Sequence, residues 1–248
     1  MKVIITIPAY NEGKTIGLVI NNIKNVMDKT PYNYKVQVID DGSKDKTSEI
    51  SKAAGAVVYR HPYNCGLAET FRTEIKKALK QKADIIVHTD ADGQYDSNAI
   101  PLLIQEVEKG YDLVLGDRFR GGIEDMPLIK NIGNKAFSKS ISKIINFKVY
   151  DCQTGFRAFT REVAESIQIN STHTYTQEQI IKAVRQKFRI KEIPVRFLKR
   201  PGKSRLIKHP LEYATKAWIN IFRIQRDYNP LKFFGKIGLA FFIPGFII

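Results

Sequence analysis

The chain has 248 residues, of which 43% are hydrophobic and 26% are charged. This composition excludes a disordered or fibrous protein and supplies enough apolar side chains for one α/β core. Forty Lys and Arg residues against 25 Asp and Glu give a net charge of +15, which indicates an anionic partner such as nucleic acid, a membrane surface or a phosphorylated substrate. A Lys-rich surface that only keeps a protein soluble would carry the same charge.

The cysteines and the N-terminus exclude further classes. Cys65 and Cys152 match no metal-binding or disulfide spacing, so we expect free thiols in a reducing compartment. The chain opens directly on an apolar run without a basic region or a cleavage site. This pattern predicts a first strand rather than a signal peptide.

Short β-branched runs alternate along the chain with longer segments of helical periodicity. Strands are predicted at residues 3–7, 36–39, 56–59, 85–89, 113–115 and 190–197. Helices are predicted at residues 67–79, 100–107, 128–145 and 177–188. In the first of these helices Leu67, Phe71, Ile75 and Leu79 recur at every fourth position and are expected to face the core. The alternation is typical of a mostly parallel sheet flanked by helices.

The composition changes after residue 197. A basic loop covers residues 198–209, an aromatic and basic helix is predicted at 210–226, and residues 233–248 are apolar apart from Lys236. The last twelve residues carry no charge but are fewer than the roughly 20 that span a bilayer. We expect an interfacial anchor or the start of a truncated transmembrane helix, and a helix docked on the core is the alternative. The predicted boundaries are therefore a catalytic domain at 1–206, an amphipathic juxtamembrane segment at 207–232 and a hydrophobic segment at 233–248.

Acidic clusters follow three of the predicted strands. Asn11 and Glu12 follow the first strand, Asp40 and Asp41 the second, and Asp90 begins the third cluster, Asp-Ala-Asp-Gly-Gln. Because open α/β sheets bind ligands at the carboxyl ends of their strands, we expect these clusters to meet at one edge of the sheet. The four histidines, by contrast, have no metal-ligand spacing and are expected to be structural: His61, His88, His173 and His209.

The Asp-x-Asp turn predicts a site for a divalent cation. The carboxylates of Asp90 and Asp92 offer the hard oxygen ligands that Mg²⁺ prefers, and Gln94 adds a neutral oxygen. A bound cation would neutralise the charge that develops on a diphosphate leaving group. A solvated acidic turn is the alternative, but its place beside two further clusters favours the metal site.

In combination, these motifs resemble glycosyltransferase family 2, and especially its branch that contains the dolichyl-phosphate mannose synthases. The resemblance covers about residues 2–206 and rests on PAYNE, DDGSKD, DADGQ, GDRF, DCQTGFRAF and EIPVRFLKRPGKSR. It implies a GT-A fold, a Mg²⁺ or Mn²⁺ cofactor, catalysis through Asp90, Asp92 and Gln94, and inverting transfer from a nucleotide sugar. The implied acceptor is a polyprenyl phosphate at the cytoplasmic face of a membrane.

The resemblance also implies roles for individual residues. Nucleoside binding is implied for Pro8, Tyr10, Glu12 and Asp41, and acceptor-phosphate binding for Arg118, Lys130, Arg200, Lys203 and Arg205. The family often has Arg where this chain has Lys130, and a Lys offers a point charge rather than a bidentate fork. In DCQTGFR we expect Gly155 to permit close packing and Arg157 to pair with a carboxylate.

A phosphate acceptor agrees with one missing motif. A phosphate monoester is already an anionic nucleophile at neutral pH, whereas a hydroxyl acceptor needs a general base. The QxxRW motif of processive polysaccharide synthases is missing, since the only Trp, Trp218, follows Thr-Lys-Ala. Transfer to a sugar or protein hydroxyl, with Glu178 as base, stays an alternative.

Three other classes of protein agree less well with the sequence. A Rossmann dehydrogenase would need G-x-G-x-x-G after the first strand, and PAYNEGK does not supply it. Nucleic acid is not an expected partner, because the acidic clusters would repel its backbone. A membrane-surface adaptor on the same fold is the non-enzyme alternative.

Overall fold

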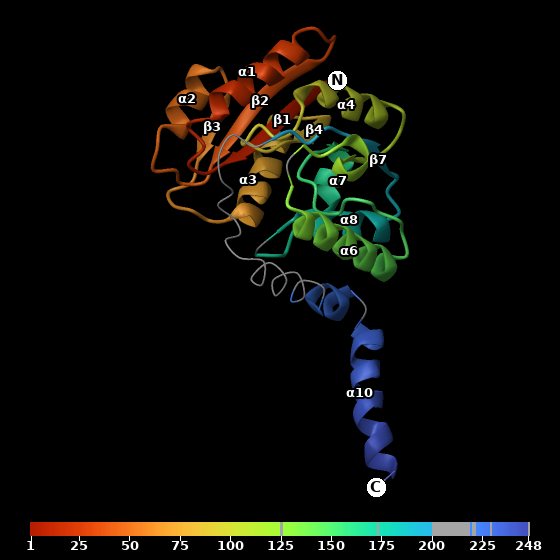
Figure 1. Cartoon of the computed structure of the whole chain (residues 1–248). Helices are drawn as coiled ribbons and strands as arrows, with labels where there is room; N and C mark the ends of the chain where they lie inside the picture. The colour runs from red at the N-terminus through yellow and green to blue at the C-terminus, as the bar shows by residue number, and fades with distance from the viewer. Residues whose placement is uncertain (125, 173, 200–218, 220–221, 229, 248) are drawn as a thin grey trace. The chain divides into compact units, whose positions relative to one another are not determined.

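The computed structural model describes residues 1–124, 126–172, 174–199, 219, 222–228 and 230–247 (Figure 1). The chain divides into two compact units. The first unit comprises Met1–Met126 and Tyr150–Lys203, and the second comprises Pro127–Val149 and Ser204–Ile248. The three predicted domain boundaries are a different division, and they stay a prediction.

The described residues of the first unit form a seven-stranded sheet in the order β3-β2-β1-β4-β6-β5-β7. Its strands are β1 (Lys2–Ala9), β2 (Asn33–Asp40), β3 (Val57–Arg60), β4 (Ile85–His88), β5 (Leu113–Asp117), β6 (Arg157–Thr160) and β7 (Ile190–Pro194). Neighbouring strands run parallel except at β6, which is antiparallel to both β4 and β5. The predicted mostly parallel α/β sheet is confirmed, and β6 is the strand that the sequence pattern did not predict.

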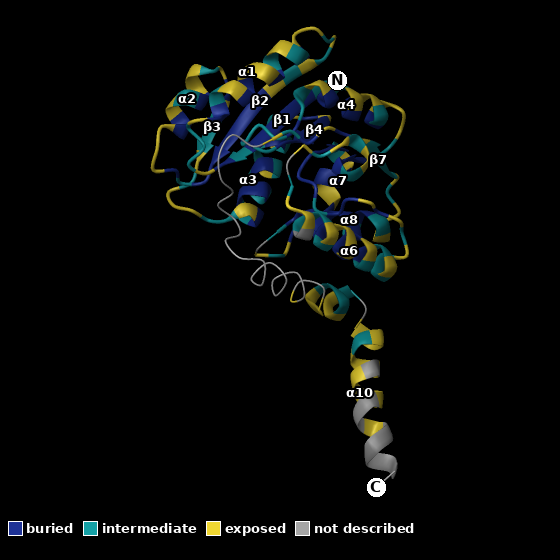
Figure 2. Cartoon of the chain, in the orientation of Figure 1, coloured by how far each residue is buried: buried dark blue, intermediate teal, exposed yellow. Residues whose placement is uncertain are grey.

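Helices pack on both faces of this sheet. The helices of the first unit are α1 (Ile16–Met27), α2 (Thr47–Ala53), α3 (Leu67–Lys80), η1 (Ser97–Ala99), α4 (Ile100–Glu108), α5 (Arg118–Gly121), α7 (Arg161–Ser166) and α8 (Thr176–Arg185). Alternate β1 residues Val3, Ile5 and Ile7 join α1 and α4 in the main apolar core. Strands β1, β4 and β5 are almost entirely buried, whereas the edge strands β3 and β7 are half-buried or exposed (Figure 2).

The apolar stripe predicted for α3 is only partly correct. Phe71 is buried, but Leu67 is exposed, and Ile75 and Leu79 are half-buried. The side chain of Glu74 is fully buried instead. The face of α3 that packs on the sheet is therefore rotated from the predicted stripe and carries an acidic residue.

The second unit contains α6 (Leu128–Ile145) and α10 (Pro230–Ile247). Ser142 near the end of α6 both donates to the carbonyl of Val149 and accepts from its amide, which closes the turn after the helix. In α10, Leu231, Phe234, Leu239 and Phe242 are exposed. Among the described residues, no helix is long and apolar enough to cross a membrane.

Candidate active site

The three acidic clusters follow three adjacent strands. β1 lies between β2 and β4, and all three run parallel, so their carboxyl ends meet at one edge of the sheet. In the register, Ala9 pairs with Asp40, and Thr6 pairs with His88. The sheet thus brings together the three segments in which the site was predicted.

The loops after β1 and β2 are tied to each other. The amide of Asn11 donates to Ser43 Oγ at 2.8 Å, and the amide of Lys44 donates to Asn11 Oδ1 at 2.7 Å. Asn11 adopts a positive φ of 54°, a conformation that Asn tolerates better than most residues. Gly42 is required in the second loop, because a Cβ there would lie 2.5 Å from the carbonyl carbon of Tyr63.

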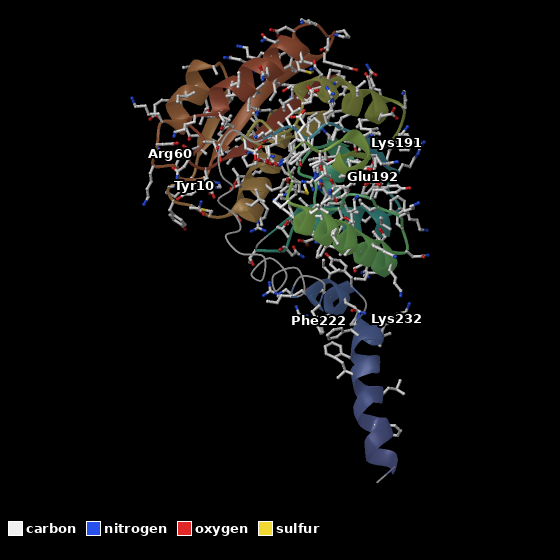
Figure 3. The ribbon with its side chains drawn as sticks, in the orientation of Figure 1. Tyr10, Arg60, Lys191, Glu192, Phe222 and Lys232 are labelled. Atoms are coloured by element: carbon white, nitrogen blue, oxygen red, sulfur yellow. The ribbon has the colours of Figure 1, made fainter. Side chains whose placement is uncertain are left out.

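The residues predicted to bind the nucleoside differ in exposure. Tyr10 is 39% exposed and projects at the surface of the first unit (Figure 3). Pro8 and Glu12 are half-buried, and Glu12 accepts from Thr15 Oγ1 at 3.1 Å. Asp41 is 5% exposed.

Asp41 is held by three donors. Its Oδ1 lies 2.8 Å from His61 Nδ1 and accepts from the amide of Cys65, and its Oδ2 accepts from the amide of Gly66. His61 Nε2 in turn lies 2.9 Å from Thr73 Oγ1 on α3. The ligand atoms of Asp41, His61 and Cys65 lie within 4.8 Å of one another. A carboxylate has about four acceptor positions, so Asp41 keeps at most one for a ligand.

The predicted metal ligands lie in the loop after β4. The Asp90 carboxylate is 39% exposed. Asp92 Oδ1 accepts from the amide of Gln94 at 3.1 Å, which closes a tight turn. The side-chain amide of Gln94 donates to the carbonyl of Leu198 at 3.2 Å, and this leaves its Oε1 as the atom that could bind a cation.

The DCQTG turn packs directly against this loop. A Cβ on Gly155 would lie 2.9 Å from Asp90 Oδ1, so a larger residue there would displace the Asp90 carboxylate. The amide of Gly155 also donates to the hydroxyl of Tyr95 at 3.0 Å. The predicted close packing at Gly155 is therefore present, and its neighbour is the first predicted metal ligand.

Beneath Asp90 lies a buried polar network from β4, α3 and the residue before α8. His88 Nδ1 lies 2.8 Å from Glu74 Oε2, and His88 Nε2 lies 2.6 Å from the hydroxyl of Tyr175 and 3.7 Å from Asp90 Oδ1. Burial lowers the pKa of His88, but the carboxylates of Glu74 and Asp90 outweigh it and raise the pKa to about 9. Tyr175 stacks on Phe71 with ring centroids 3.8 Å apart.

Arg118 is almost completely buried and forms a two-pronged ion pair. Its Nε and Nη2 donate to the carboxylate of Asp151 at 2.6 and 2.8 Å. The ring of Phe197 lies over the guanidinium, and its centroid is 5.0 Å from Arg118 Cζ. Arg118 therefore first serves to neutralise Asp151, and its remaining N–H groups are those that could meet an acceptor phosphate.

Comparison with known proteins identifies the family. The model of glycosyl transferase family 2 matches residues 4–168. The chain belongs to glycosyl transferase family 2. It is 33% identical to the UDP-N-acetylglucosamine–dolichyl-phosphate N-acetylglucosaminyltransferase of Methanococcus voltae, over 77% of this chain and 83% of the relative. It is 31% identical to the dolichyl-phosphate hexose transferase of Haloferax volcanii, over 79% and 83% of the two chains.

A solved structure has the same fold as this family 2 transferase. Glucosyl-3-phosphoglycerate synthase from Mycobacterium tuberculosis, in complex with Mn²⁺ and UDP-glucose, superimposes with a TM-score of 0.69. The match covers 92% of this chain and 79% of the synthase at 18% identity. This likeness shows the GT-A-like sheet flanked by helices. It does not show the predicted membrane association of the C-terminal helices.

The transferase has a further buried arginine whose partners were predicted wrongly. Arg157 donates to the carbonyls of Thr154 and Thr176 and to Gln179 Oε1 rather than to a carboxylate. Its Nε has no hydrogen-bond partner within the described ranges, and burial lowers the pKa of Arg157. Neutral oxygens and the face of Tyr175 therefore surround this cation in the described part of the chain.

The remaining predicted residues have separate outcomes. Lys130 lies in α6, within the second unit. Arg200, Lys203 and Arg205 lie outside the described residues. Glu178, the base of the alternative mechanism, accepts from the amides of Asn170 and Ser171 and pairs with Lys182 at 2.8 Å. Because the Glu178 carboxylate already accepts from three donors, its first role is to hold the loop before α8 in place.

Sequence reasoning missed Glu74, His88 and Tyr175 as a group. They are 14 and 87 residues apart in the chain and come from three elements. The one available signal was His88 itself, a polar residue in the otherwise apolar strand IIVH. Both cysteines are free thiols as predicted, and Cys152 is buried.

Proposed function

We propose that this transferase moves a sugar from a nucleotide diphosphate donor to a polyprenyl phosphate at a membrane surface, with inversion at the anomeric carbon. The observation that carries the proposal is the edge of the sheet where the Asp90–Asp92 loop meets the two loops predicted to bind the nucleoside. The names of two relatives support the acceptor, since both are dolichyl-phosphate transferases.

The residues after β4 suit a Mg²⁺ or Mn²⁺ ion. Asp90, Asp92 and Gln94 offer two carboxylates and an amide oxygen, which are ligands for hard divalent cations. The Asp90 carboxylate is partly open, and Gly155 leaves the space beside it free of a side chain. When bound, the ion would stabilise the negative charge of the diphosphate leaving group. The solved synthase binds Mn²⁺ together with UDP-glucose, which supports the choice of cation.

The chain's own residues then account for binding and orientation. Tyr10, Pro8, Glu12 and Asp41 would bind the nucleoside, and Asp41 would do so with the single acceptor position that its three donors leave open. No general base is needed, because the second pKa of a phosphate monoester is about 6 and the acceptor is already an anion at neutral pH. Acceptor-phosphate binding by Arg118, Lys130, Arg200, Lys203 and Arg205 stays a proposal.

The membrane part of the proposal concerns the cytoplasmic face. A net charge of +15 favours association with anionic lipid headgroups, where a lipid phosphate emerges. The exposed apolar side chains of α10 favour an interfacial position for that helix. The sugar and the base of the donor are left open, because one relative's name gives UDP-N-acetylglucosamine and the other's gives only a hexose.

The test is transfer of radiolabelled sugar into an organic-soluble product. Purified protein, Mn²⁺ and a panel of nucleotide sugars are incubated with a polyprenyl phosphate or with the matching polyprenol. We expect labelled lipid only with the phosphate, and turnover at least about 100-fold lower for Asp92→Ala, by analogy with loss of a group that stabilises transition-state charge. Equal use of the free alcohol would contradict the proposal. So would an Asp92→Ala variant whose turnover stays near that of wild type and still depends on the metal.

A further inference from the structure

The Glu74–His88–Tyr175 network has no place in the proposed chemistry, although it lies directly behind the site. The side chains of Glu74 and His88 are fully buried, and Tyr175 is 1% exposed. Burying three polar side chains costs free energy unless each is hydrogen-bonded. Among the residues that the structure describes, Glu74 Oε1 nevertheless has no hydrogen-bond partner, so the network is not optimised for stability alone.

The imidazole of His88 is fixed from both sides. Glu74 on α3 holds Nδ1 at 2.8 Å, and the Tyr175 hydroxyl holds Nε2 at 2.6 Å. Tyr175 is itself fixed by its stack on Phe71, whose ring planes are 6° from parallel. Because its ring cannot turn without losing both contacts, His88 presents Nε2 in one position beneath Asp90.

The Asp90 carboxylate is therefore enclosed on two sides. Its Oδ1 lies 3.7 Å from His88 Nε2 and close to the Cα of Gly155, where an added Cβ would lie only 2.9 Å away. The Asp90 side chain is 39% exposed on its remaining sides. A carboxylate confined in this way has few rotamers to lose when it binds a cation.

We propose that His88 is a positioning residue that, held by Glu74 and Tyr175, orients the Asp90 carboxylate for the catalytic cation. Residues that hold a metal ligand in place typically contribute 10- to 100-fold to metal affinity. The inference rests on the proposed metal role of Asp90. It differs from a merely structural role because it predicts a loss of cation affinity that does not follow the loss of fold stability.

Two amide substitutions separate the two ring nitrogens. His88→Asn keeps an amide near Nδ1, where it can still meet Glu74, but leaves nothing beneath Asp90. His88→Gln carries its amide to about the position of Nε2. We therefore expect Mn²⁺ affinity to fall about 10- to 100-fold in His88→Asn and to stay within about threefold of wild type in His88→Gln.

The measurement is calorimetric titration of Mn²⁺ into the full chain, in separate arms with saturating UDP and GDP, together with the thermal unfolding midpoint. Equal Mn²⁺ affinity in wild type and His88→Asn would overturn the inference. The inference would also be overturned if His88→Asn and His88→Gln lost equal Mn²⁺ affinity and if this loss followed the decrease in their unfolding midpoints. If His88→Asn does not fold, Tyr175→Phe replaces it, since it keeps the ring stack. Affinity at least about threefold weaker is expected there, and wild-type affinity would overturn the inference.

Asp92→Ala separates this inference from the proposed function. If wild type binds Mn²⁺, Asp92→Ala does not, and His88→Asn binds as wild type does, only the positioning role of His88 fails. If Asp92→Ala binds Mn²⁺ as tightly as wild type, the proposed metal site fails, and the inference fails with it.

Discussion

Asp41 shows how a residue predicted to bind substrate is also part of the folded structure. Its carboxylate collects His61 and the amides of Cys65 and Gly66 at the start of α3. A buried donor that loses its acceptor costs about 1–3 kcal/mol. A substitution at Asp41 therefore affects the free energy of unfolding as well as any contact with the donor.

We expect Asp41→Ala to lower the thermal unfolding midpoint and to raise the donor KM more than it lowers kcat. The physical reason is that uniform binding is lost while the reacting centre keeps its groups. Thermal unfolding gives the midpoint, and initial rates measured over a range of donor concentrations give KM and kcat. Glu165→Ala is the matched control, because that carboxylate lies in an exposed ion pair worth little. An unchanged donor KM would contradict the nucleoside role of Asp41.

At Gly155, the addition of one methyl group should lower activity without lowering stability. In Gly155→Ala the new Cβ would meet the Asp90 carboxylate, so Asp90 must move. We expect metal-dependent turnover to fall by about 10-fold or more, because a misplaced catalytic group costs on that order. Gly238→Ala, where an added Cβ would meet no described atom within 4 Å, should be neutral. Full activity of Gly155→Ala in a transfer assay would show that Asp90 needs no fixed position.

At the scale of elements, the contact between α5 and the turn before β6 depends on Arg118 and Asp151. Asp151 is fully buried, and removal of one partner from a buried ion pair typically costs about 3–5 kcal/mol. We expect Arg118→Ala to lose about that much in urea unfolding. Arg118→Lys should lose less, since it keeps the charge but not the two-pronged geometry. Wild-type stability together with a raised acceptor KM would instead favour a role of Arg118 in acceptor binding alone.

Strands β1, β2 and β4 could be predicted from sequence, because they are mostly apolar runs that end in acidic loops. The same pattern predicted which loops meet, and the order of β2, β1 and β4 brings them together. β6 could not be predicted in this way. It begins with the buried Arg157 and ends with Thr160, so it lacks the apolar run that identifies β4.

The residues around the predicted site were harder to predict than the ligands themselves. Asp90, Asp92 and Gln94 follow each other in sequence, and local spacing is enough to group them. Glu74 and Tyr175 reach His88 only through packing of α3 and α8, and no local pattern encodes that contact. Whether the predicted ligands bind a cation stays a prediction that the titrations above would test.

At the scale of the whole molecule, the exposed apolar residues of α10 predict binding to membranes. Phe234 and Phe242 are 56% and 66% exposed. We expect the double substitution of both by Ser to weaken partitioning onto anionic liposomes, measured by co-flotation, by about 100-fold or more, since each buried apolar side chain contributes about 1.5–3 kcal/mol. Leu18→Ser, an equally exposed apolar position in α1, is the control and should float as wild type does. Equal flotation of all three proteins would contradict membrane binding through α10.

The antiparallel β6 has a consequence for the order in which the protein folds. Ile85 of β4 pairs with Thr160 of β6, 75 residues later, and β6 then separates β4 from β5. Contacts between residues so distant in sequence form slowly, because the intervening loop must first be closed. A ribosome that has released only residues 1–126 has made every predicted cation ligand but not the Gly155 turn beside them. We therefore expect the nucleoside half of the site to form first during synthesis, and cation binding to appear only when β6 enters the middle of the sheet.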